Sequence, residues 1–481
     1  MGVIVQVIAT FILSYSSLVM GLTFAWPSST FLIFTSENTT LNRPMTDGET
    51  ALLGSLSSIG ALVGNPIASV LLNTIGRKYC GILTASIGVI SWLMISFSNQ
   101  VEVILAALFI YGISSSVFLV IPVFITEFCQ ESIRGTMAAC SVTFFGLGML
   151  VSNLLGGCLE YHTLTYVSLS MSVFGVAMFL FLKESPVYLM TKGRKQEAIK
   201  SIAFYRNEKP NSKEVLQELE KIRRILNPDI EGTLKHYELP EKQKLNSNLE
   251  STTPEKVGFF KFIKKSRSTR RAMYTILTVL TAAILQGLNV VLVYAKPLFH
   301  DVVSEEVISS TLCSILLAAT TVVSGIIAGY LTDLVGRRNL LIYASFGAGI
   351  CCAVIGFQIH LNWGPKWLIA ILIYLYSAAY TLGAGTIPFV LLSEVFLPEV
   401  KSYMSMLALE WTWLCNFLVL YVFNSLTSAM GLGGIFFIFS VACFLTAVYS
   451  IYFVPETKGL TVDVIQLQFL KSGIRRSDIE I

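Results

Sequence analysis

The sequence has few charged residues for its length. Of 481 residues, only 13% are Asp, Glu, Lys or Arg, whereas 54% are hydrophobic. An ordinary soluble protein carries about 25% charged residues, so this composition argues against a soluble protein. The formal net charge of +4 is small and is not concentrated in a pattern typical of nucleic-acid binding, so we expect no nucleic-acid partner.

The side chains that build metal and redox sites are sparse and scattered. The four histidines, at 162, 236, 300 and 360, form no cluster, and the nine cysteines show no repeating spacing. The sequence also contains no nucleotide-binding loop and no pattern typical of an activated nucleophile. These absences argue against an enzyme, and we expect neither a metal nor another cofactor.

Long apolar runs are what the sequence has instead. A helix needs about 20 apolar residues to cross a bilayer, and twelve runs reach that length. Their approximate limits are 3–33, 50–73, 79–97, 101–128, 134–157, 163–183, 271–296, 305–333, 339–359, 365–394, 401–424 and 432–454. The first run is not preceded by the basic region of a cleavable signal peptide. We therefore predict an all-α membrane protein with twelve transmembrane helices.

Lys and Arg are distributed unequally between the two sides of the predicted helices. With the N-terminus inside, 31 of the 34 fall in cytoplasmic segments, 21 of them between Lys183 and Arg271. The other three are Arg43, Lys296 and Lys366. Because positively charged loops are retained on the cytoplasmic side, we expect both termini to lie in the cytoplasm.

Three short motifs occur twice, each time after corresponding apolar runs of the two halves. The pairs are Gly76-Arg77-Lys78 with Gly336-Arg337-Arg338, 260 residues apart; Glu127 and Arg134 with Glu394 and Lys401, 267 residues apart; and Glu184 with Glu456, 272 residues apart. Nearly equal separations in the same order indicate an internal repeat. We predict two pseudo-symmetric six-helix bundles, residues 1–183 and 271–454.

A polar linker, residues 184–270, separates the bundles, and a tail, residues 455–481, follows them; we expect both to be cytoplasmic. Within the linker, residues 194–206 and 212–226 have the spacing of amphipathic helices. Residues 227–256 are polar and poor in aromatics, and we expect them to be mobile. Residues 259–271 mix Phe with basic residues, a pattern that anchors a helix at the bilayer or binds anionic lipid as a regulatory contact.

The loop after the first apolar run contains a glycosylation sequon, Asn38-Thr39-Thr40. The predicted topology places this loop outside, so we expect Asn38 to be glycosylated. A sequon on the outer face favours the secretory route and hence the plasma membrane, although an internal membrane stays open.

The repeated motifs resemble those of the sugar porter family of the major facilitator superfamily, and within it the insect facilitated trehalose and hexose transporters. The resemblance covers nearly the whole chain. It rests on GRK and GRR, the Glu-x6-Arg and Glu-x6-Lys pairs, ESPVYL, QGLN, GAGTIPF and PETKGLT. It implies the major facilitator fold and facilitative transport of a sugar such as trehalose or a hexose by alternating access. Independently of the resemblance, we expect the chain to work in the lipid bilayer, as a monomer.

The resemblance further implies a gate on the cytoplasmic side. Ion pairs between helix ends of the two bundles would hold that side shut in the outward-facing state and break when it opens. The implied gate residues are Arg77, Lys78, Glu127, Arg134, Glu184, Asp333, Arg337, Arg338, Glu394, Lys401 and Glu456. Alternatively, the basic residues only retain the loops inside. Asn73 stands where the family has an acid, so we expect the two halves to contribute unequally.

A sugar site is implied near the membrane midplane, between the bundles. Sugar hydroxyls need amides and hydroxyls, and an aromatic face packs against the C–H surface of the ring. The implied residues are Gln286, Asn289, Tyr294, Thr321, Phe389, Trp413 and Asn416. Helix–helix contact is the alternative role of each polar one. The glutamine pair usual in the family would fall at Ala283 and Ile284, which cannot hydrogen-bond a sugar.

One ionisable residue lies deep in a predicted span. Glu410 comes nine residues after Lys401, about 13 Å into the eleventh helix. It is a proton site, part of the substrate site, or a carboxylate satisfied by its neighbours.

Three functions stay open: sugar uniport, proton-coupled symport, and a transport-inactive sugar sensor. Family symporters often carry a carboxylate in the first helix, but residues 1–34 contain no Asp or Glu. Coupling would then have to run through Glu410. The altered glutamine positions and the long polar linker motivate the sensor. We favour uniport.

Overall fold

The computed structural model describes residues 2–226, 267–303, 308–396, 398–460 and 462–471. Within these ranges the side chains at 131, 224–226, 398–402, 463, 470 and 471 are not described. The stretch expected to be mobile, 227–256, and most of the mixed Phe and basic stretch lie outside the described residues. Every regular element in the described ranges is an α-helix.

Seven helices build the first half of the chain. They are α1 (Gly2–Thr35), α2 (Asp47–Thr74), α3 (Arg77–Phe97), α4 (Val101–Ser114), α5 (Val117–Phe128), α6 (Glu131–Cys158) and α7 (Tyr161–Leu180). The fourth predicted span is thus two helices, α4 and α5, which meet at Ser115 and Ser116. The linker that follows forms α8 (Pro186–Thr191), α9 (Lys195–Arg206) and α10 (Lys213–Leu226). The two helices predicted in the linker are confirmed as α9 and α10.

Nine helices build the second half. They are α14 (Arg267–Leu285), α15 (Leu288–Val293), α16 (Ala295–Val302), α17 (Ser310–Val335), α18 (Arg337–Leu361), α19 (Trp367–Leu382), α20 (Ile387–Val395), α21 (Pro398–Phe453) and α22 (Val462–Lys471). The seventh and tenth predicted spans are broken, the seventh at Gln286 and Gly287 and the tenth between Gly383 and Thr386. Broken helices of this kind line the substrate sites of many transporters.

The described residues contain eleven helical runs long and apolar enough to cross a membrane. One of them, in α21, covers the last two predicted spans and bends at Gly431, whose φ is +73°. The bend lies between predicted limits 401–424 and 432–454, so the eleven runs account for all twelve predicted spans. The prediction of an all-α membrane protein is confirmed.

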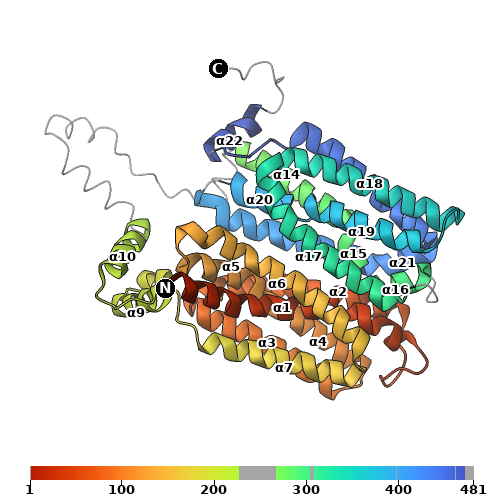
Figure 1. Ribbon diagram of the computed structural model, residues 1–481, viewed down its shortest axis with the longest axis horizontal. Helices are drawn as coiled ribbons and strands as arrows, with labels where there is room; N and C mark the ends of the chain where they lie inside the picture. Colours follow the sequence, from red (N-terminus) through yellow and green to blue (C-terminus); the bar gives the residue numbers. More distant parts are fainter. Residues whose placement is uncertain (1, 227–266, 304–307, 397, 461, 472–481) are drawn as a thin grey trace.

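The helices lie side by side in two groups. In the first group α1 packs along α6 and α7, α2 along α4, and α3 along α4 and α7; in the second, α18 packs along α19 and α21, α14 along α21, and α17 along α19 (Figure 1). We call the first group the N bundle and the second the C bundle. The end that carries α9 and α10, at the left of Figure 1, is here the loop end, and the opposite end is the far end.

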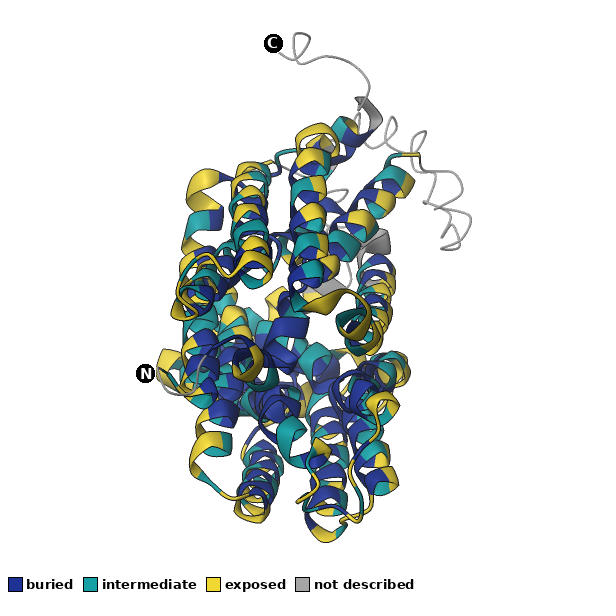
Figure 2. Cartoon of the chain, turned by 90° about the vertical axis from the view of Figure 1, so that its right-hand side faces the viewer, coloured by how far each residue is buried: buried dark blue, intermediate teal, exposed yellow. Residues whose placement is uncertain are grey.

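Side chains on the outside of the bundles are apolar. Among the large exposed ones are Phe97, Tyr330, Tyr343 and Leu361, each between 66% and 75% exposed. Figure 2 shows buried residues between the helices and exposed ones on their outer sides. Apolar side chains outside and a packed interior are what a surface surrounded by lipid tails requires.

Two seams join the bundles. Along one, α2 lies against α21, and along the other, α6 lies against α17. On the second seam a methyl group at Gly146 would lie 3.0 Å from Val322, and one at Gly157 would overlap Thr311. Small residues let these two helices approach closely.

The far end is closed between the bundles. The backbone N–H of Lys296 donates to the hydroxyl of Ser28 at 3.0 Å. The rings of Phe31 on α1 and Tyr294 meet edge to face at 5.6 Å. A methyl group at Gly54 on α2 would lie 2.5 Å from the Tyr294 hydroxyl. These contacts leave no room between α1, α2 and the α15–α16 junction.

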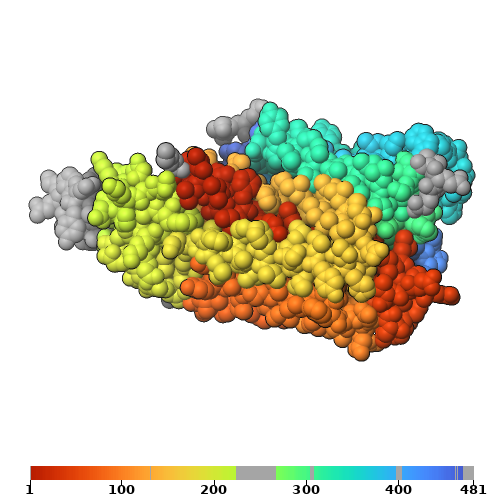
Figure 3. Space-filling model, turned by 60° about the horizontal axis from the view of Figure 1, so that its bottom comes forward, coloured from red at the N-terminus to blue at the C-terminus, as the bar shows by residue number. Residues whose placement is uncertain are grey.

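The linker helices form a knob on the loop end of the N bundle (Figure 3). Val215, Leu219 and Ile222, on the predicted apolar face of α10, are all buried. Tyr205 of α9 stacks on Phe128 of α5 at 4.4 Å. The knob is therefore fastened to the N bundle by packed side chains.

Candidate functional site

The repeated motifs of the first half meet at the loop end. Arg77 donates from Nη2 to Oε1 of Glu127 at 2.7 Å, and the hydroxyl of Ser185 donates to the other oxygen of Glu127. Glu184 accepts the backbone N–H of Arg77 at 2.9 Å and that of Lys78 at 3.1 Å. These residues, Arg77, Lys78, Glu127, Glu184 and Ser185, come from the ends of different spans and form one network. We call it the N-side cluster.

The second half repeats this network with the corresponding residues. Arg337 donates from Nη2 to Oε1 of Glu394 at 2.9 Å, and the hydroxyl of Thr457 donates to Oε2 of Glu394 at 2.6 Å. Glu456 accepts the backbone N–H of Arg337 at 2.9 Å and that of Arg338 at 3.2 Å. We call this the C-side cluster. The sequence repeat is therefore also a repeat in space.

Two glutamates cap helix N-termini in these clusters. The first N–H groups of a helix have no partner within it and attract negative charge; Glu184 meets those of α3 and Glu456 those of α18. The preceding residues, Gly76 and Gly336, have φ of +100° and +93°, and a Cβ there would collide with the capping carboxylate. Burial raises the pKa of the Glu184 carboxyl, although three backbone N–H donors oppose the shift.

One difference between the clusters lies four residues before the first arginine of each motif. Asp333 lies 3.1 Å from Nη2 of Arg337, with its side chain 76% exposed. At the corresponding place in the first half, the uncharged Asn73 donates to the carbonyl of Ser69 at 3.4 Å. The C-side cluster thus contains an ion pair for which the N-side cluster has no corresponding acid.

The second basic residue of each copy reaches the last turn of a neighbouring helix. Nζ of Lys78 donates to the carbonyl of Leu180 at 3.1 Å, and Nη2 of Arg338 donates to the carbonyl of Ile451. Carbonyls at helix C-termini lack partners within the helix and favour positive charge.

Two predicted gate residues lie apart from these networks. Arg134 donates weakly to the carbonyl of Cys129, at 3.5 Å, and in the described part of the chain its buried Nε has no hydrogen-bond partner. The side chain of Lys401 lies outside the described residues. Glu127 is bound by Arg77 and Ser185 rather than by Arg134. The ion pairs of both clusters join helices of one bundle, so this conformation does not display the predicted pairs between bundles.

Two of the predicted sugar residues meet a residue of the other bundle. Asn289 of α15 donates to Oδ1 of Asn416 on α21 at 2.9 Å, and Asn416 donates to the hydroxyl of Ser58 on α2 at 2.9 Å. Asn416 and Ser58 are buried and Asn289 is half-buried. This chain of polar groups crosses the seam near the middle of both helices; we call it the amide layer.

Aromatic side chains lie near the amide layer. Tyr294 stacks on Phe423 at 5.0 Å and closes the far side. Trp413 comes one turn before Asn416 and packs against apolar residues of the N bundle. A cavity of about 20 Å³ lies beside Trp413, between α21 and residues of α1, α2 and α4. It has room for about one water molecule.

Two of the other three predicted sugar residues are hydrogen-bonded within the C bundle. Gln286 is fully buried and donates to the hydroxyl of Ser345 at 3.4 Å, inside the C bundle. Thr321 meets the hydroxyl of Ser377 at 3.1 Å, between α17 and α19. Phe389 is 46% exposed on α20. The break at Gly287 explains the first case, because its φ of +89° turns the chain between Gln286 and Asn289.

Glu410 lies on the α2–α21 seam, six residues before Asn416. Its Oε1 is buried and has no hydrogen-bond partner among the described residues. The polar side chain that faces its carboxyl is Asn65 on α2. Asn38, at the far end, is exposed.

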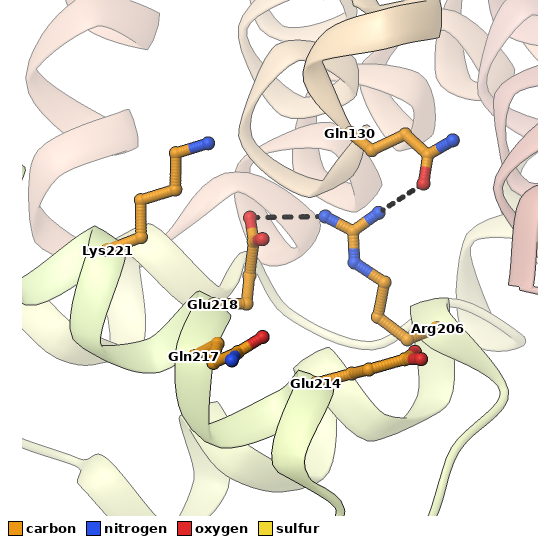
Figure 4. Close-up of a pocket in the computed structure, with 6 residues that line it drawn as sticks. All are labelled: Gln130, Arg206, Glu214, Gln217, Glu218 and Lys221. Carbon is orange, nitrogen blue, oxygen red and sulfur yellow. Dashed lines mark hydrogen bonds and ion pairs between the residues drawn. The ribbon is translucent and has the colours of Figure 1, made fainter.

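A polar pocket of about 360 Å³ lies at the loop end, between the α5–α6 turn and the linker helices. Figure 4 shows Arg206 reaching across it to Gln130 and Glu218. Its guanidinium lies 3.1 Å from each. The pocket is outside the bundles and far from the amide layer. We therefore interpret it as part of the contact that holds the linker helices against the N bundle. In the described part of the chain, no three His, Cys, Asp or Glu residues are placed to hold a metal.

Sequence reasoning missed several partners. Ser185 and Thr457 each directly follow a repeated glutamate and are therefore also 272 residues apart. This shared separation is the sequence signal that could have identified them. Ser58 and Asn65 lie in a span rich in Ser and Gly, where nothing in the sequence marks one polar residue over the next.

A family model described as sugar (and other) transporter matches residues 2–469. The facilitated trehalose transporter Tret1 of Bombyx mori is 26% identical, over 98% of this chain and 88% of that protein. Tret1 of Polypedilum vanderplanki is 25% identical, over 98% of this chain and 90% of that one.

Solved structures share the fold. A partially occluded inward-open conformation of the xylose transporter XylE from E. coli superposes with a TM-score of 0.74 at 18% identity, over 95% of this chain and 99% of that one. A D-xylose-proton symporter superposes with a TM-score of 0.68 at 19% identity, over 94% and 98%. The resemblance read from the motifs is confirmed: this chain is an integral membrane protein of the sugar transporter family, with the major facilitator fold.

Proposed function

We propose that this chain is a facilitative carrier of a hexose or trehalose, working by alternating access, with its sugar site at the amide layer. The observation that carries the proposal is the hydrogen-bonded chain from Asn289 through Asn416 to Ser58. It joins two predicted sugar residues to the opposite bundle at the level where carriers of this fold class bind substrate.

The chemistry of the layer suits a polyol. A side-chain amide has two N–H donors and an oxygen with two lone pairs, so the bonds between Asn289 and Asn416 leave donors and acceptors for sugar hydroxyls. Trp413 supplies an apolar ring one helical turn away. We propose that sugar enters when the bundles separate at this level and that it replaces the contact to Ser58.

Alternating access needs two closures, and one is visible. The far end is sealed by Tyr294 and Ser28, whereas the ion pairs at the loop end lie within single bundles. We propose that the loop end is cytoplasmic, because it carries most of the Lys and Arg residues, and that this conformation faces inward. The plasma membrane and a monomeric state are part of the same proposal.

The packing of α6 on α17 suggests how the loop end closes. Gly146 faces Val322, and Gly157, eleven residues later, faces Thr311, eleven residues earlier. The same register continued twelve residues toward the loop end brings Arg134 opposite residue 334, next to Asp333. We propose that these opposite charges pair when the seam closes there, as part of the gate expected from the sequence.

Two alternatives make different predictions. A proton-coupled symporter would accumulate sugar against its gradient when a pH gradient is imposed, and a sensor would bind sugar without moving it. The Tret1 relatives are named as facilitated transporters, which favours uniport here.

The test is uptake of labelled glucose and labelled trehalose into proteoliposomes. We expect saturable uptake of at least one sugar, and its loss in Asn289→Ala. Ser345→Ala, inside the C bundle, is the matched control and should retain uptake. Absence of uptake of both sugars by folded wild-type protein would refute the carrier, and full uptake by Asn289→Ala would refute the site.

A further inference from the structure

The α2–α21 seam carries polar pairs at regular intervals. They are Thr50 with Asn424 at 3.3 Å, Ser58 with Asn416 at 2.9 Å, and Asn65 facing Glu410. The first two pairs are eight residues apart on both helices, and the third follows after seven residues on α2 and six on α21. Glu410 thus occupies the inner position of a row that runs from the far end toward the loop end.

Glu410 is the only member of this row that can carry charge, and its carboxyl is incompletely satisfied. Oε1 is buried and without a hydrogen-bond partner in the described part of the chain. An amide such as that of Asn65 can donate a hydrogen bond to one carboxylate oxygen, but the other oxygen is then left without a donor. Glu410 as a whole is half-buried, and its ionised carboxylate is unfavourable in this position unless water or a cation reaches it, whereas a neutral carboxyl is tolerated better.

The basic side chains of α14, which packs along α21, are Arg267, Arg270 and Arg271; all three lie at its loop-end start, ten or more residues before Thr281, and Arg271 donates to the carbonyl of Phe469 at 3.0 Å. Facing this part of α21, α2 presents Asn65, and α14 presents Thr281, which accepts from Trp411. Cys415, which lies near Thr281, is the nearest titratable group on α21 itself.

The charged groups of α18 and α20, which also pack on α21, are engaged elsewhere, and α15 has none. Glu394 of α20 is bound by Arg337 and Thr457, and Arg337 and Arg338 of α18 belong to the C-side cluster.

We propose that the Glu410 carboxyl is a proton-binding site, and that its neutral form holds α2 against α21 while its ionised form draws in water and loosens the seam. Glu410 lies about 9 Å from Asn416 along α21, nearer to the loop end. The amide layer therefore separates Glu410 from the far end. Its proton therefore exchanges with the loop-end side alone. Combined with the transport function proposed above, on which this step rests, cytoplasmic pH sets the rate of sugar transport without a proton being carried across.

The proton site is tested without transport by infrared spectroscopy of the purified protein. We expect the C=O band of a protonated carboxyl to disappear as pH rises from mildly acidic to mildly alkaline, and this change to be absent in Glu410→Gln. Glu160→Gln, an exposed acid at the start of α7, is the matched control and should keep the band. Equal bands in wild type and Glu410→Gln would overturn the proposal.

The effect on transport is tested in cells whose cytosol is acidified with a permeant weak acid at constant external pH. Wild type should change its rate of labelled-sugar uptake with internal pH, whereas Glu410→Gln should keep the acidic wild-type rate throughout. A pH response retained in Glu410→Gln, or accumulation of sugar driven by an external acid pulse, would overturn it. If wild type takes up no sugar at any pH, the carrier proposal fails, and the infrared band alone decides the proton site.

Discussion

Replacing Glu184 tests whether its carboxylate matters as a hydrogen-bond acceptor or as a charge. Its Oε1 accepts three backbone N–H groups, from Ser185 at 2.8 Å, Arg77 at 2.9 Å and Lys78 at 3.1 Å. Glu184→Gln keeps an oxygen in that place, whereas Glu184→Ala leaves all three donors without it. Since burial disfavours the charged form of Glu184, the charge itself should add little.

The magnitude follows from the donors. A buried donor left without an acceptor costs about 1–3 kcal/mol, and water at the loop end can reach the first turn of α3 in part. We therefore expect Glu184→Ala to lower the free energy of unfolding by about 2–4 kcal/mol and Glu184→Gln to change it by less than about 1 kcal/mol.

A thiol-reactive dye measures this in detergent, because six of the nine free cysteines are buried and become reactive on unfolding. The melting temperature should fall clearly for Glu184→Ala and little for Glu184→Gln. Equal losses for both variants would show that the charge matters, and no loss for either would refute the capping role.

Three further predictions follow from the loop end. Because the folded-state pKa of Glu184 is raised, its favourable contribution is complete below the ordinary carboxyl pKa and is lost as pH rises through the folded-state value; Glu184→Gln should therefore gain melting temperature relative to wild type as pH rises. Reversing Arg134 or Asp333 alone should slow uptake by up to about fivefold, since an exposed pair is worth about 0–1 kcal/mol. The double reversal should restore part of the loss, because reversed Asp333 still lacks its pair with Arg337; a double variant no faster than the Asp333 variant would disprove the pair. Arg206→Ala should speed proteolysis between α9 and α10, whereas the exposed Arg194→Ala should not; equal digestion would show that Arg206 does not fasten the linker.

Much of the fold follows from sequence because its signals are periodic or repeated. Apolar runs predict the spans, and the repeated separations predict that Arg77 and Arg337 occupy equivalent places. The apolar face of α10 is visible in the spacing of Val215 and Leu219, which the structure buries together.

The proposed substrate site is less predictable from sequence because it depends on helix breaks. Gln286 and Asn289 are three residues apart and would share a face of an unbroken helix, but Gly287 separates them, and only Asn289 reaches the amide layer. Thr321 likewise satisfies its hydroxyl within its own bundle. A lone polar residue in a span can face a ligand or a neighbouring helix, and sequence spacing alone does not distinguish these.

The measurement that tests the account most directly is counterflow in proteoliposomes. Vesicles are loaded with unlabelled sugar and diluted into a trace of labelled sugar at equal pH on both sides. A uniporter with its site at the amide layer should accumulate label transiently, and Asn416→Ala should abolish the overshoot. The absence of an overshoot in the wild type despite sugar binding, or an unchanged overshoot in Asn416→Ala, would contradict it.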